Sequence, residues 1–534
     1  MPELPEKVGE IAHEPTAQFA SQATTNIQPA IAHCGERDAV FRQTHLERFV
    51  FEQHLGEQDW DGLQGAIATN PELIKVENQK FTTQAALNLE LSTIRLMQRG
   101  KGKVSEIALS SQVDQALADI PLTEEQRQAI QLTCATPDQF IAWQGSAGSG
   151  KTYALNALKR VAQAQGIQVQ GFAPSAQAAH GLGQALGIET ETVAALLASQ
   201  RRETDQSLWI IDEAGLLSMK DAHALLTRAT ADKARIILVG DTKQLSAVEA
   251  GNPFKSLQAG GITTAHLDET LRQQTRELKT AVRLIAQGEI VLGIDALEAA
   301  GSLREIDNAE LRHQRLAQDY LALSAGERVK TLMLAGTNQE RVALTQTLRT
   351  ALQAEGSLGQ DEFTVIGLRQ KNITQAQARY VTVYQPGDVL VPTQDYKKQR
   401  LLKGQPYTVA SVNRKNQRLV VETPGGQVME VDPGRCPRKS IYTTQPMNIA
   451  PGDQLRWTKN DRATKKRNGQ CFTVEQIQSD GTARIVDSEG QSQQINLSGR
   501  QYVDYAWVST TYSSQVLDVS HDECQPLAVK TPAR

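Results

Sequence analysis

The sequence predicts an α/β protein with parallel sheets, a helical region near its N-terminus and two small β modules nearer its C-terminus. From about residue 116, short apolar runs such as 139–143 and 208–212 alternate with helical patterns, which is typical of βαβ units. Residues 31–115 instead space apolar side chains three and four positions apart, as amphipathic helices do. Residues 385–500 contain short strand patterns separated by turns.

Length and composition exclude several classes of protein. The chain has 534 residues, a net charge of −4, 40% hydrophobic and 22% charged residues, which fits a folded protein of several domains rather than a disordered one. A negative net charge does not suit a protein that passively coats nucleic acid, although it is compatible with local basic grooves. Five separated cysteines without a CxxC pair indicate neither a disulfide framework nor a zinc site. Without a long apolar run we expect no membrane segment and a cytoplasmic location.

An internal repeat lies in the β-rich region. QPGDVLVP at 385–392 is echoed by APGDQLRW at 450–457, and KGQPYTV at 403–409 is echoed by NGQCFTV at 468–474. Both matches have the same offset of 65 residues, which indicates duplication of one small β module. Modules of this length suit small closed barrels. The alternative is a coincidence between two β-rich stretches.

A glycine-rich segment at 145–152 fits the pattern GxxxxGK followed by Ser or Thr. An apolar strand candidate precedes it, and a helix pattern that Gly166 would end follows it. In this arrangement, backbone N–H groups and the helix N-terminus bind phosphate. Lys151 would reach the β- and γ-phosphates, and the Thr152 hydroxyl would ligate Mg²⁺. The alternative is a glycine-rich turn with an exposed lysine. The expected nucleotide-binding residues are Gly145, Ser146, Ala147, Gly148, Ser149, Gly150, Lys151 and Thr152.

Two further strands are expected to end in polar residues at the same edge of the sheet. Residues 208–211 deliver Asp212 and Glu213, and residues 236–240 lead to Gln244. Asp212 would hold Mg²⁺, and Glu213 would orient or deprotonate the attacking water. Gln244 could sense the γ-phosphate through its amide. An acidic pair after a strand is otherwise a helix cap or a solvated loop, and a loop glutamine is usually inert.

Together these segments resemble the motifs of a superfamily 1B (RecD-like) DNA helicase. The likeness is greatest to the helicase portion of conjugative relaxases of the TraI/TrwC (MobF) type. Segments that resemble the Q motif and motifs I, Ia, II, III and IV follow in family order at 122–126, 145–152, 173–179, 212–214, 240–245 and 267–274. The resemblance implies a P-loop NTPase with RecA-like domains, ATP and Mg²⁺ as cofactors and single-stranded DNA as partner. Conjugation or mobilisation proteins are further candidate partners.

The resemblance also assigns roles that the residues alone leave open. It implies that Gln126 contacts adenine, that Gln244 senses the γ-phosphate and that Arg272 acts as an arginine finger, because a guanidinium neutralises charge on the transferred phosphoryl group. The expected catalytic residues are therefore Lys151, Glu213, Gln244 and Arg272. The DNA contacts that it implies are Pro174, Ser175, Gln177, Ser514 and Gln515.

The resemblance also implies a domain plan. The β modules look like the SH3-like 2B insertion of the second motor domain. We expect a flexible N-terminus at 1–30, a helical domain at 31–115, the RecA-like ATPase domain 1A at 116–275, a connecting region with the first part of RecA-like domain 2A at 276–384, the duplicated SH3-like β modules at 385–500, a return to domain 2A at 501–515 and a divergent tail at 516–534.

Two departures from the family pattern shape the expectation. Residues 1–115 contain four separated histidines and no tyrosine, so we expect no nicking activity. Residues 509–515 resemble the beginning of motif V, but Val516 stands where the family has glycine, and no motif VI follows. The second RecA-like domain is therefore expected to be incomplete.

We thus predict an ATP-dependent helicase or translocase on single-stranded DNA, the helicase fragment of a conjugative relaxase. The alternative is a truncated remnant that binds ATP and DNA without unwinding. Another P-loop enzyme such as a kinase is a remote third option, against which the segments that resemble motifs Ia, III and IV argue.

Overall fold

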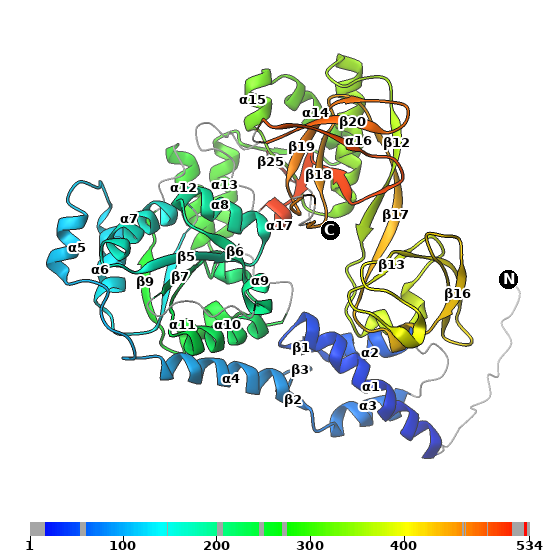
Figure 1. Ribbon diagram of the computed structural model, residues 1–534, viewed down its shortest axis with the longest axis horizontal. Helices are drawn as coiled ribbons and strands as arrows, with labels where there is room; N and C mark the ends of the chain where they lie inside the picture. The colour runs from blue at the N-terminus through cyan, green and yellow to red at the C-terminus, as the bar shows by residue number, and fades with distance from the viewer. Residues whose placement is uncertain are drawn as a thin grey trace, which may run out of the picture. The chain divides into compact units, whose positions relative to one another are not determined.

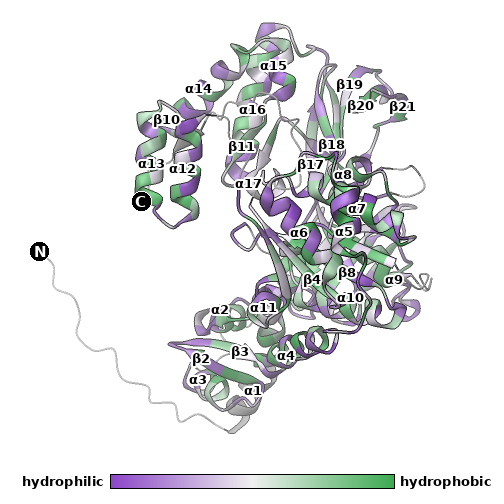
Figure 2. Cartoon of the chain, turned by 90° about the vertical axis from the view of Figure 1, so that its left-hand side faces the viewer, coloured by the Kyte–Doolittle hydropathy of each residue, from purple (hydrophilic) through white to green (hydrophobic). Residues whose placement is uncertain are grey.

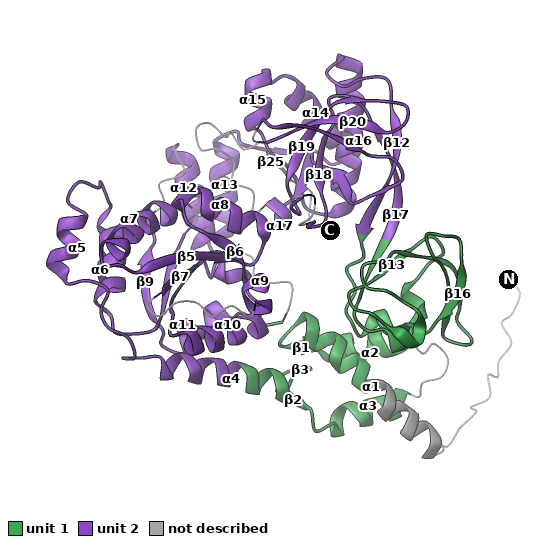
Figure 3. Ribbon diagram, in the orientation of Figure 1, with its two compact units in different colours: residues 1–89, 248–251, 370–442 green, residues 90–247, 252–369, 443–534 purple. Residues whose placement is uncertain are grey.

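The computed structural model describes residues 17–53, 60–146, 148–199, 207–244, 250–269, 275–461, 464, 466–488, 490–514 and 528–530. The chain divides into two compact units (Figure 3). The first unit comprises residues 1–89, 248–251 and 370–442, and the second comprises residues 90–247, 252–369 and 443–534.

A six-stranded parallel sheet forms the largest element of the second unit (Figure 1). Its strands in spatial order are β6 (Thr190–Thr192), β5 (Gln168–Ala173), β7 (Ser207–Ile211), β8 (Arg235–Gly240), β4 (Phe140–Gly145) and β9 (Thr263–Leu267). The helices in and just before this region are α4 (Gln84–Arg99), α5 (Ser110–Ala116), α6 (Glu124–Ala135), α7 (Lys151–Ala164), α8 (Ala176–Leu186), α9 (Val193–Ala198), α10 (Met219–Asp232) and α11 (Pro253–Ala259). The predicted α/β fold with parallel βαβ units is confirmed.

Alternate residues of each strand pack on opposite faces of this sheet. Ile141 and Trp143 of β4 join a core with α6, α7 and α8, whereas Phe140 and Ala142 join a core with α9, α10 and α11. Because both faces are covered, the strands are apolar along their whole length. The helices show a polar and an apolar side (Figure 2), as expected for elements that cover such a sheet.

The region that packs on the parallel sheet begins earlier along the chain than residue 116. Met97 of α4 packs in one core of the sheet, and Ile107 and Val113 pack in the other. The helical patterns after residue 90 were expected to belong to a separate N-terminal domain. Their apolar side chains instead cover the sheet, which places them in the second unit.

The remainder of the second unit combines helices with short parallel strand pairs. The helices are α12 (Arg276–Ala286), α13 (Ile290–Ala299), α14 (Ala309–Leu321), α15 (Ala325–Lys330), α16 (Asn338–Glu355) and α17 (Thr511–Ser514). The two pairs are β10 (Leu303–Glu305) with β25 (Ala528–Lys530), and β11 (Met333–Ala335) with β24 (Val508–Thr510). Leu344, Leu348 and Val508 belong to the core beneath β11 and β24.

The first unit contains a small α/β layer. It consists of α1 (Ala17–Arg37), β1 (Phe41–Arg42), α2 (Gln43–Gln53), α3 (Trp60–Thr69), β2 (Leu73–Glu77) and β3 (Lys80–Thr83). The helical patterns predicted α2 and α4, but the antiparallel sheet β1–β3–β2 was not foreseen. These strands are only two to five residues long, too short for an alternation pattern to be recognised.

Two four-stranded antiparallel meanders occupy the repeat. The first contains β13 (Val389–Pro392), β14 (Tyr407–Asn413), β15 (Arg418–Glu422) and β16 (Val428–Val431), and the second contains β18 (Gln454–Trp457), β19 (Cys471–Ile477), β20 (Thr482–Asp487) and β21 (Ser492–Asn496). The 65-residue offset also relates their hydrogen bonds. Gly387 N donates to Val409 O, as Gly452 N does to Val474 O. A bulge interrupts both second strands at matching places, Val409–Ser411 and Val474–Gln476.

The two meanders lie in different units, unlike the expected single block at 385–500. β17 (Lys439–Ile449) runs from the first unit into the second. The first meander has its own core around Tyr407 and Val421. Tyr380, which precedes this meander in the chain, packs edge to face on Phe49 of α2, with 5.9 Å between the ring centroids. The second meander packs around Trp457 and is extended by β23 (Val503–Tyr505), which pairs with β18. β12 (Phe363–Gln370) pairs with β22 (Arg500–Gln501) and adds Val365 to the same core.

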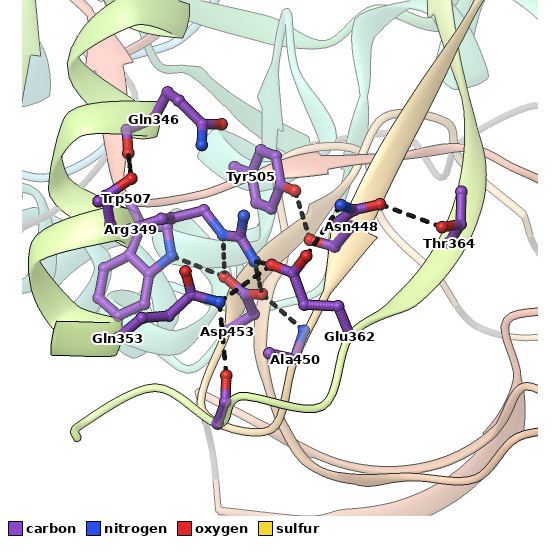
Figure 4. Close-up of polar contacts among 12 residues, drawn as sticks. Gln346, Arg349, Gln353, Glu362, Thr364, Asn448, Ala450, Asp453, Tyr505 and Trp507 are labelled. Atoms are coloured by element: carbon purple, nitrogen blue, oxygen red, sulfur yellow. Dashed lines mark hydrogen bonds and ion pairs between the residues drawn. The ribbon is translucent and has the colours of Figure 1, made fainter.

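A buried ion pair joins the second meander to α16 (Figure 4). Arg349 Nε and Nη2 donate to the two carboxylate oxygens of Asp453 at 2.9 and 2.8 Å. The Trp507 ring N–H also donates to Asp453, at 3.0 Å, and the Arg349 guanidinium lies over the Tyr505 ring, 4.7 Å from its centroid. Glu362 accepts a further bond from Arg349 at 3.2 Å. These contacts offset the free-energy cost of burying the Asp453 charge, because both charges are paired and hydrogen-bonded.

No helix in the described part of the chain combines the length and hydropathy that crossing a membrane requires.

Candidate active site

The glycine-rich loop connects β4 to the N-terminus of α7, as predicted. Gly148 and Gly150 have φ angles of 77° and 73°, a region that favours glycine, and Gly150 is the N-cap of α7. The apolar face predicted for the helix is buried, and Gly166 has a positive φ directly after the helix ends. Ala147 lies outside the described residues. The loop thus presents a helix N-terminus at the carboxyl edge of the sheet, where anions bind favourably.

The Lys151 side chain folds back over the loop. Its Nζ donates to the carbonyl oxygens of Gly145 and Ser146, at 2.8 and 3.0 Å. A Cβ at Gly145 would lie 2.9 Å from Lys151 Cδ and 3.0 Å from Ser149 Oγ, so the turn has no room for a side chain there. The ammonium group therefore lies within the loop that was predicted to bind phosphate.

Ser149 provides a direct test of whether the loop fits a phosphate. Its residue is only 3% exposed, and its Oγ has no hydrogen-bond partner among the described residues. A buried hydroxyl without a partner is costly and indicates a ligand atom that would satisfy it. With the adjacent Lys151 ammonium and the N-terminus of α7, these donors fit a phosphate group.

Gln126 lies against the loop with a 2% exposed residue surface. Its amide oxygen accepts the N–H of Thr123 at 3.1 Å as part of a capping box of α6, and its amide nitrogen donates to Ser149 O at 3.1 Å. The side chain therefore ties α6 to the phosphate loop. The contact of Gln126 with adenine stays a prediction.

Asp212 and Glu213 follow the fully buried strand β7, as predicted. The Asp212 N–H donates to Phe172 O of β5 at 2.9 Å, which extends the sheet by one residue, and Asp212 Oδ1 accepts the N–H of Glu213 at 2.9 Å. Glu213 has a φ of 51°, an uncommon conformation for a residue with a side chain. Such strained backbone is found preferentially at functional sites.

The Glu213 carboxyl has a raised proton affinity. Its pKa increases from 4.5 to about 7, first because burial disfavours the charged form and then because Asp212 and Asp241 are negatively charged; the Lys151 ammonium partly offsets this. The interaction with Lys151 shows that the glycine loop and the acidic pair lie in one electrostatic cluster. A carboxyl with a pKa near 7 suits a general base.

Asp241 follows β8 and is the centre of a polar network that the sequence did not single out. Its Oδ1 accepts from Gln144 Nε2 at 2.8 Å and from the Lys243 N–H at 3.0 Å, and its Oδ2 accepts from Gln244 Nε2 at 3.2 Å. Gln244 therefore lies in the loop predicted to sense phosphate, held by Asp241. In the sequence, the only indication of a role for Gln144 is that a polar residue stands at the end of an otherwise apolar strand.

The Mg²⁺ prediction rests on Thr152 and Asp212. Thr152 is exposed on the first turn of α7, and no group of three or more His, Cys, Asp or Glu side chains that could hold a metal occurs among the described residues. Mg²⁺ bound with a nucleotide needs only one or two protein ligands, because phosphate oxygens and water supply the rest. A hydroxyl and a carboxylate at this edge fit that donor set.

The expected DNA contacts lie partly on β5 and α8. The Ser175 hydroxyl caps α8 by accepting the Ala178 N–H at 3.1 Å. Gln177 faces the turn after β18, since a Cβ at Gly469 would lie 2.5 Å from its Oε1. Pro174 is half-buried directly before Ser175.

Of the remaining predicted site residues, the structure describes Ser514 but not Arg272 or Gln515. Ser514 lies in α17 and donates to Thr511 O at 2.9 Å. Arg272 and Gln515, like Ala147, lie outside the described residues. The arginine finger and the DNA contacts of this group stay predictions.

The parallel sheet, the glycine loop between β4 and α7 and the acidic pair after β7 fit a P-loop NTPase domain of RecA-like α/β fold. Comparison with family models agrees with this: residues 121–308 match the AAA domain, and residues 368–449 match the DNA relaxase TraI 2B/2B-like domain.

Among characterised proteins, the chain is similar to the multifunctional conjugation protein TraI of Escherichia coli K12, with 21% identity over 492 residues. That match covers 82% of this chain and 27% of TraI. The conjugal transfer protein TraA of Rhizobium radiobacter is 31% identical over 41% of this chain and 20% of its own length. The ATP-dependent RecD2 DNA helicase of Deinococcus radiodurans is 30% identical over 35% of this chain and 27% of its own. The chain thus spans about a quarter of the TraI and RecD2 sequences that it matches.

Solved structures include Pif1 helicase from Candida albicans, with a TM-score of 0.34 and 17% identity over 75% of this chain and 88% of the other. Taken together, the sequence matches support similarity to a superfamily 1B helicase of TraI type.

Proposed function

We propose that the chain is an ATP- and Mg²⁺-dependent motor that moves along single-stranded DNA, equivalent to the helicase part of TraI-type conjugation proteins. The observation that carries the proposal is the arrangement at one edge of a parallel sheet, where Lys151 lies in the glycine loop beside the buried Ser149 hydroxyl, and Asp212, Glu213 and Asp241 follow β7 and β8. One cation at the N-terminus of α7 and three acids after β7 and β8, at the same edge of the sheet, suit a magnesium nucleotide better than a passive anion site.

Each residue of the cluster has a defined role in this proposal. Lys151 and the Ser149 hydroxyl bind the phosphate groups, and Thr152 and Asp212 hold the metal. When bound, Mg²⁺ neutralises phosphate charge. Glu213 takes a proton from the attacking water, which its pKa of about 7 permits near neutral pH.

Three further roles rest on the resemblance to superfamily 1B helicases. Gln244 senses the terminal phosphate, Arg272 neutralises charge that develops during transfer, and Gln126 contacts adenine. The surface around Ser175 and Gln177 contacts DNA. The similarity to TraI and TraA supports conjugation or mobilisation proteins as partners.

The test measures ATP hydrolysis with and without single-stranded DNA. The proposal predicts DNA-stimulated hydrolysis that Lys151→Ala abolishes. Lys159→Ala is the matched control, because Lys159 lies on the same helix and donates to Leu186 O away from the loop. Hydrolysis without DNA stimulation, or equal rates in wild type and Lys151→Ala, would refute the motor.

A second candidate function is binding of nucleotide and DNA without unwinding. The same samples distinguish it. Nucleotide affinity that Lys151→Ala abolishes, together with no turnover on single-stranded DNA, would support a binding protein. Strand separation on a forked duplex would support the helicase.

A further inference from the structure

Gln144 is a buried amide at the junction between the sheet and the phosphate loop. It precedes Gly145 at the end of β4, and its residue is 6% exposed. The neighbouring β4 residues Phe140–Trp143 are all apolar. A polar side chain at this place must be satisfied by specific partners, because burial without hydrogen bonds is costly.

The Gln144 amide has three partners that fix its orientation. Nε2 donates to Asp241 Oδ1 at 2.8 Å, and Oε1 accepts from the Thr242 N–H at 3.1 Å and from Gln258 Nε2 at 3.2 Å. The reversed amide would place an oxygen against the Asp241 carboxylate and an NH₂ group against the Thr242 N–H. The amide therefore has one favourable orientation, set by its neighbours.

These contacts connect three elements at the site. Gln144 belongs to β4, Asp241 and Thr242 belong to the loop after β8, and Gln258 belongs to α11. Asp241 in turn accepts from Gln244 Nε2 through its other oxygen, at 3.2 Å. One carboxylate thus separates the Gln144 amide from the Gln244 amide.

We propose that Gln144 is a positioning residue that holds Asp241, and through it Gln244, in register with the phosphate loop. This rests on the proposed function, in which Gln244 senses the terminal phosphate. Removal of the Gln144 amide leaves the loop donors in place, because among the described residues the amide bonds only to Asp241, Thr242 and Gln258. Asp241 keeps its bonds to Lys243 and Gln244 but loses its bond to β4, so the position of Gln244 relative to the phosphate loop is less restricted. The chain then binds phosphate but no longer distinguishes three phosphates from two.

The test compares the affinities for ADP and for AMPPNP, a non-hydrolysable ATP analogue, in the presence of Mg²⁺. Gln144→Leu removes the amide at similar volume. Gln139→Leu is the matched control: Gln139 is also a buried glutamine, one residue ahead of β4, and donates to Ala229 O and Ala234 O at 3.2 and 2.9 Å. Both variants lose buried hydrogen bonds, so both report general destabilisation.

We expect Gln144→Leu to lower the affinity for AMPPNP about tenfold while the affinity for ADP stays within about twofold; a tenfold change corresponds to roughly 1.4 kcal/mol. Gln139→Leu should change neither affinity. In a Gln244→Ala background, Gln144→Leu should have little further effect, because both substitutions act on the same contact.

Four results would overturn the positioning role: equal loss of both nucleotides in Gln144→Leu, no change in either, additive effects with Gln244→Ala, or no preference for AMPPNP in the wild type. Failure of the proposed function has a different signature. In that case Lys151→Ala would bind both nucleotides as the wild type does.

Discussion

Replacement of Glu213 with glutamine removes an acid whose ionisation the folded chain opposes. The pKa of Glu213 rises from 4.5 to about 7, mainly through burial and then through Asp212 and Asp241. The unfolded chain releases this proton near pH 4.5, but the folded chain holds it until about pH 7. Between these values the folded state binds more protons, so the free energy of unfolding falls as pH rises.

The size of the stability change follows from the difference between the pKa values of Glu213 in the folded and unfolded chain. A pKa difference from 4.5 to about 7 corresponds to roughly 3 kcal/mol of stability, present below pH 4.5 and lost once pH exceeds about 7. Glutamine has a similar shape and does not ionise. The variant should therefore gain stability over the wild type as pH rises, by up to roughly 3 kcal/mol above about pH 7.

The assay is urea-induced unfolding of the nucleotide-free chain, followed by tryptophan fluorescence, at several pH values from about 5 to about 8. Trp143 and Trp209 lie in the sheet and report on this domain. At each pH, the free energy of unfolding of the wild type is subtracted from that of the variant, so that the contributions of other titrating groups cancel. A difference that is independent of pH, or largest at low pH, would show that folding does not raise the pKa of Glu213.

Three other predictions concern the site and its support. The kcat/KM for ATP should rise with pH and level off above about pH 7, as Glu213 ionises in the free protein, and a profile that is flat from about pH 5 to about pH 8 would exclude Glu213 as the base. Ser149→Ala removes an unpaired buried hydroxyl, so it should leave thermal stability equal or raise it by up to about 1 kcal/mol while it weakens nucleotide binding several-fold; a stability loss would mean that the hydroxyl has a partner within the protein. Arg349→Met leaves the buried Asp453 carboxylate without its cation and should cost about 3–5 kcal/mol in denaturant unfolding, whereas Arg315→Met, which breaks the partly exposed pair with Asp319, should cost less than about 1 kcal/mol.

The sequence predicted the elements whose signal is local. The apolar runs of β4, β7 and β8 and the glycine loop of α7 each require particular residue types at short spacing, and the structure has them at the expected places. Lys151 and the Asp212–Glu213 pair were predicted for one edge of the sheet, because the carboxyl ends of parallel strands meet there. The repeat was also visible, because its glycines occupy turns with positive φ at Gly387 and Gly452.

What the sequence did not reveal depends on contacts between distant segments. Gln144 looks like an isolated polar residue in a strand, and only the fold places it beside Asp241 and Gln258, about a hundred residues further on. Likewise, no local pattern assigns α5 to the sheet or separates the two β meanders. Those assignments follow from which apolar faces pack together.

The central claim is that Lys151, Thr152 and Asp212 hold a magnesium nucleotide together. Titration of a fluorescent ATP analogue with and without Mg²⁺, in wild type, Lys151→Ala and Asp212→Asn, tests it most directly. We predict that Mg²⁺ tightens binding to the wild type, that Asp212→Asn loses this enhancement, and that Lys151→Ala binds at least tenfold more weakly. Equal affinities in all three proteins, with no effect of Mg²⁺, would contradict the claim.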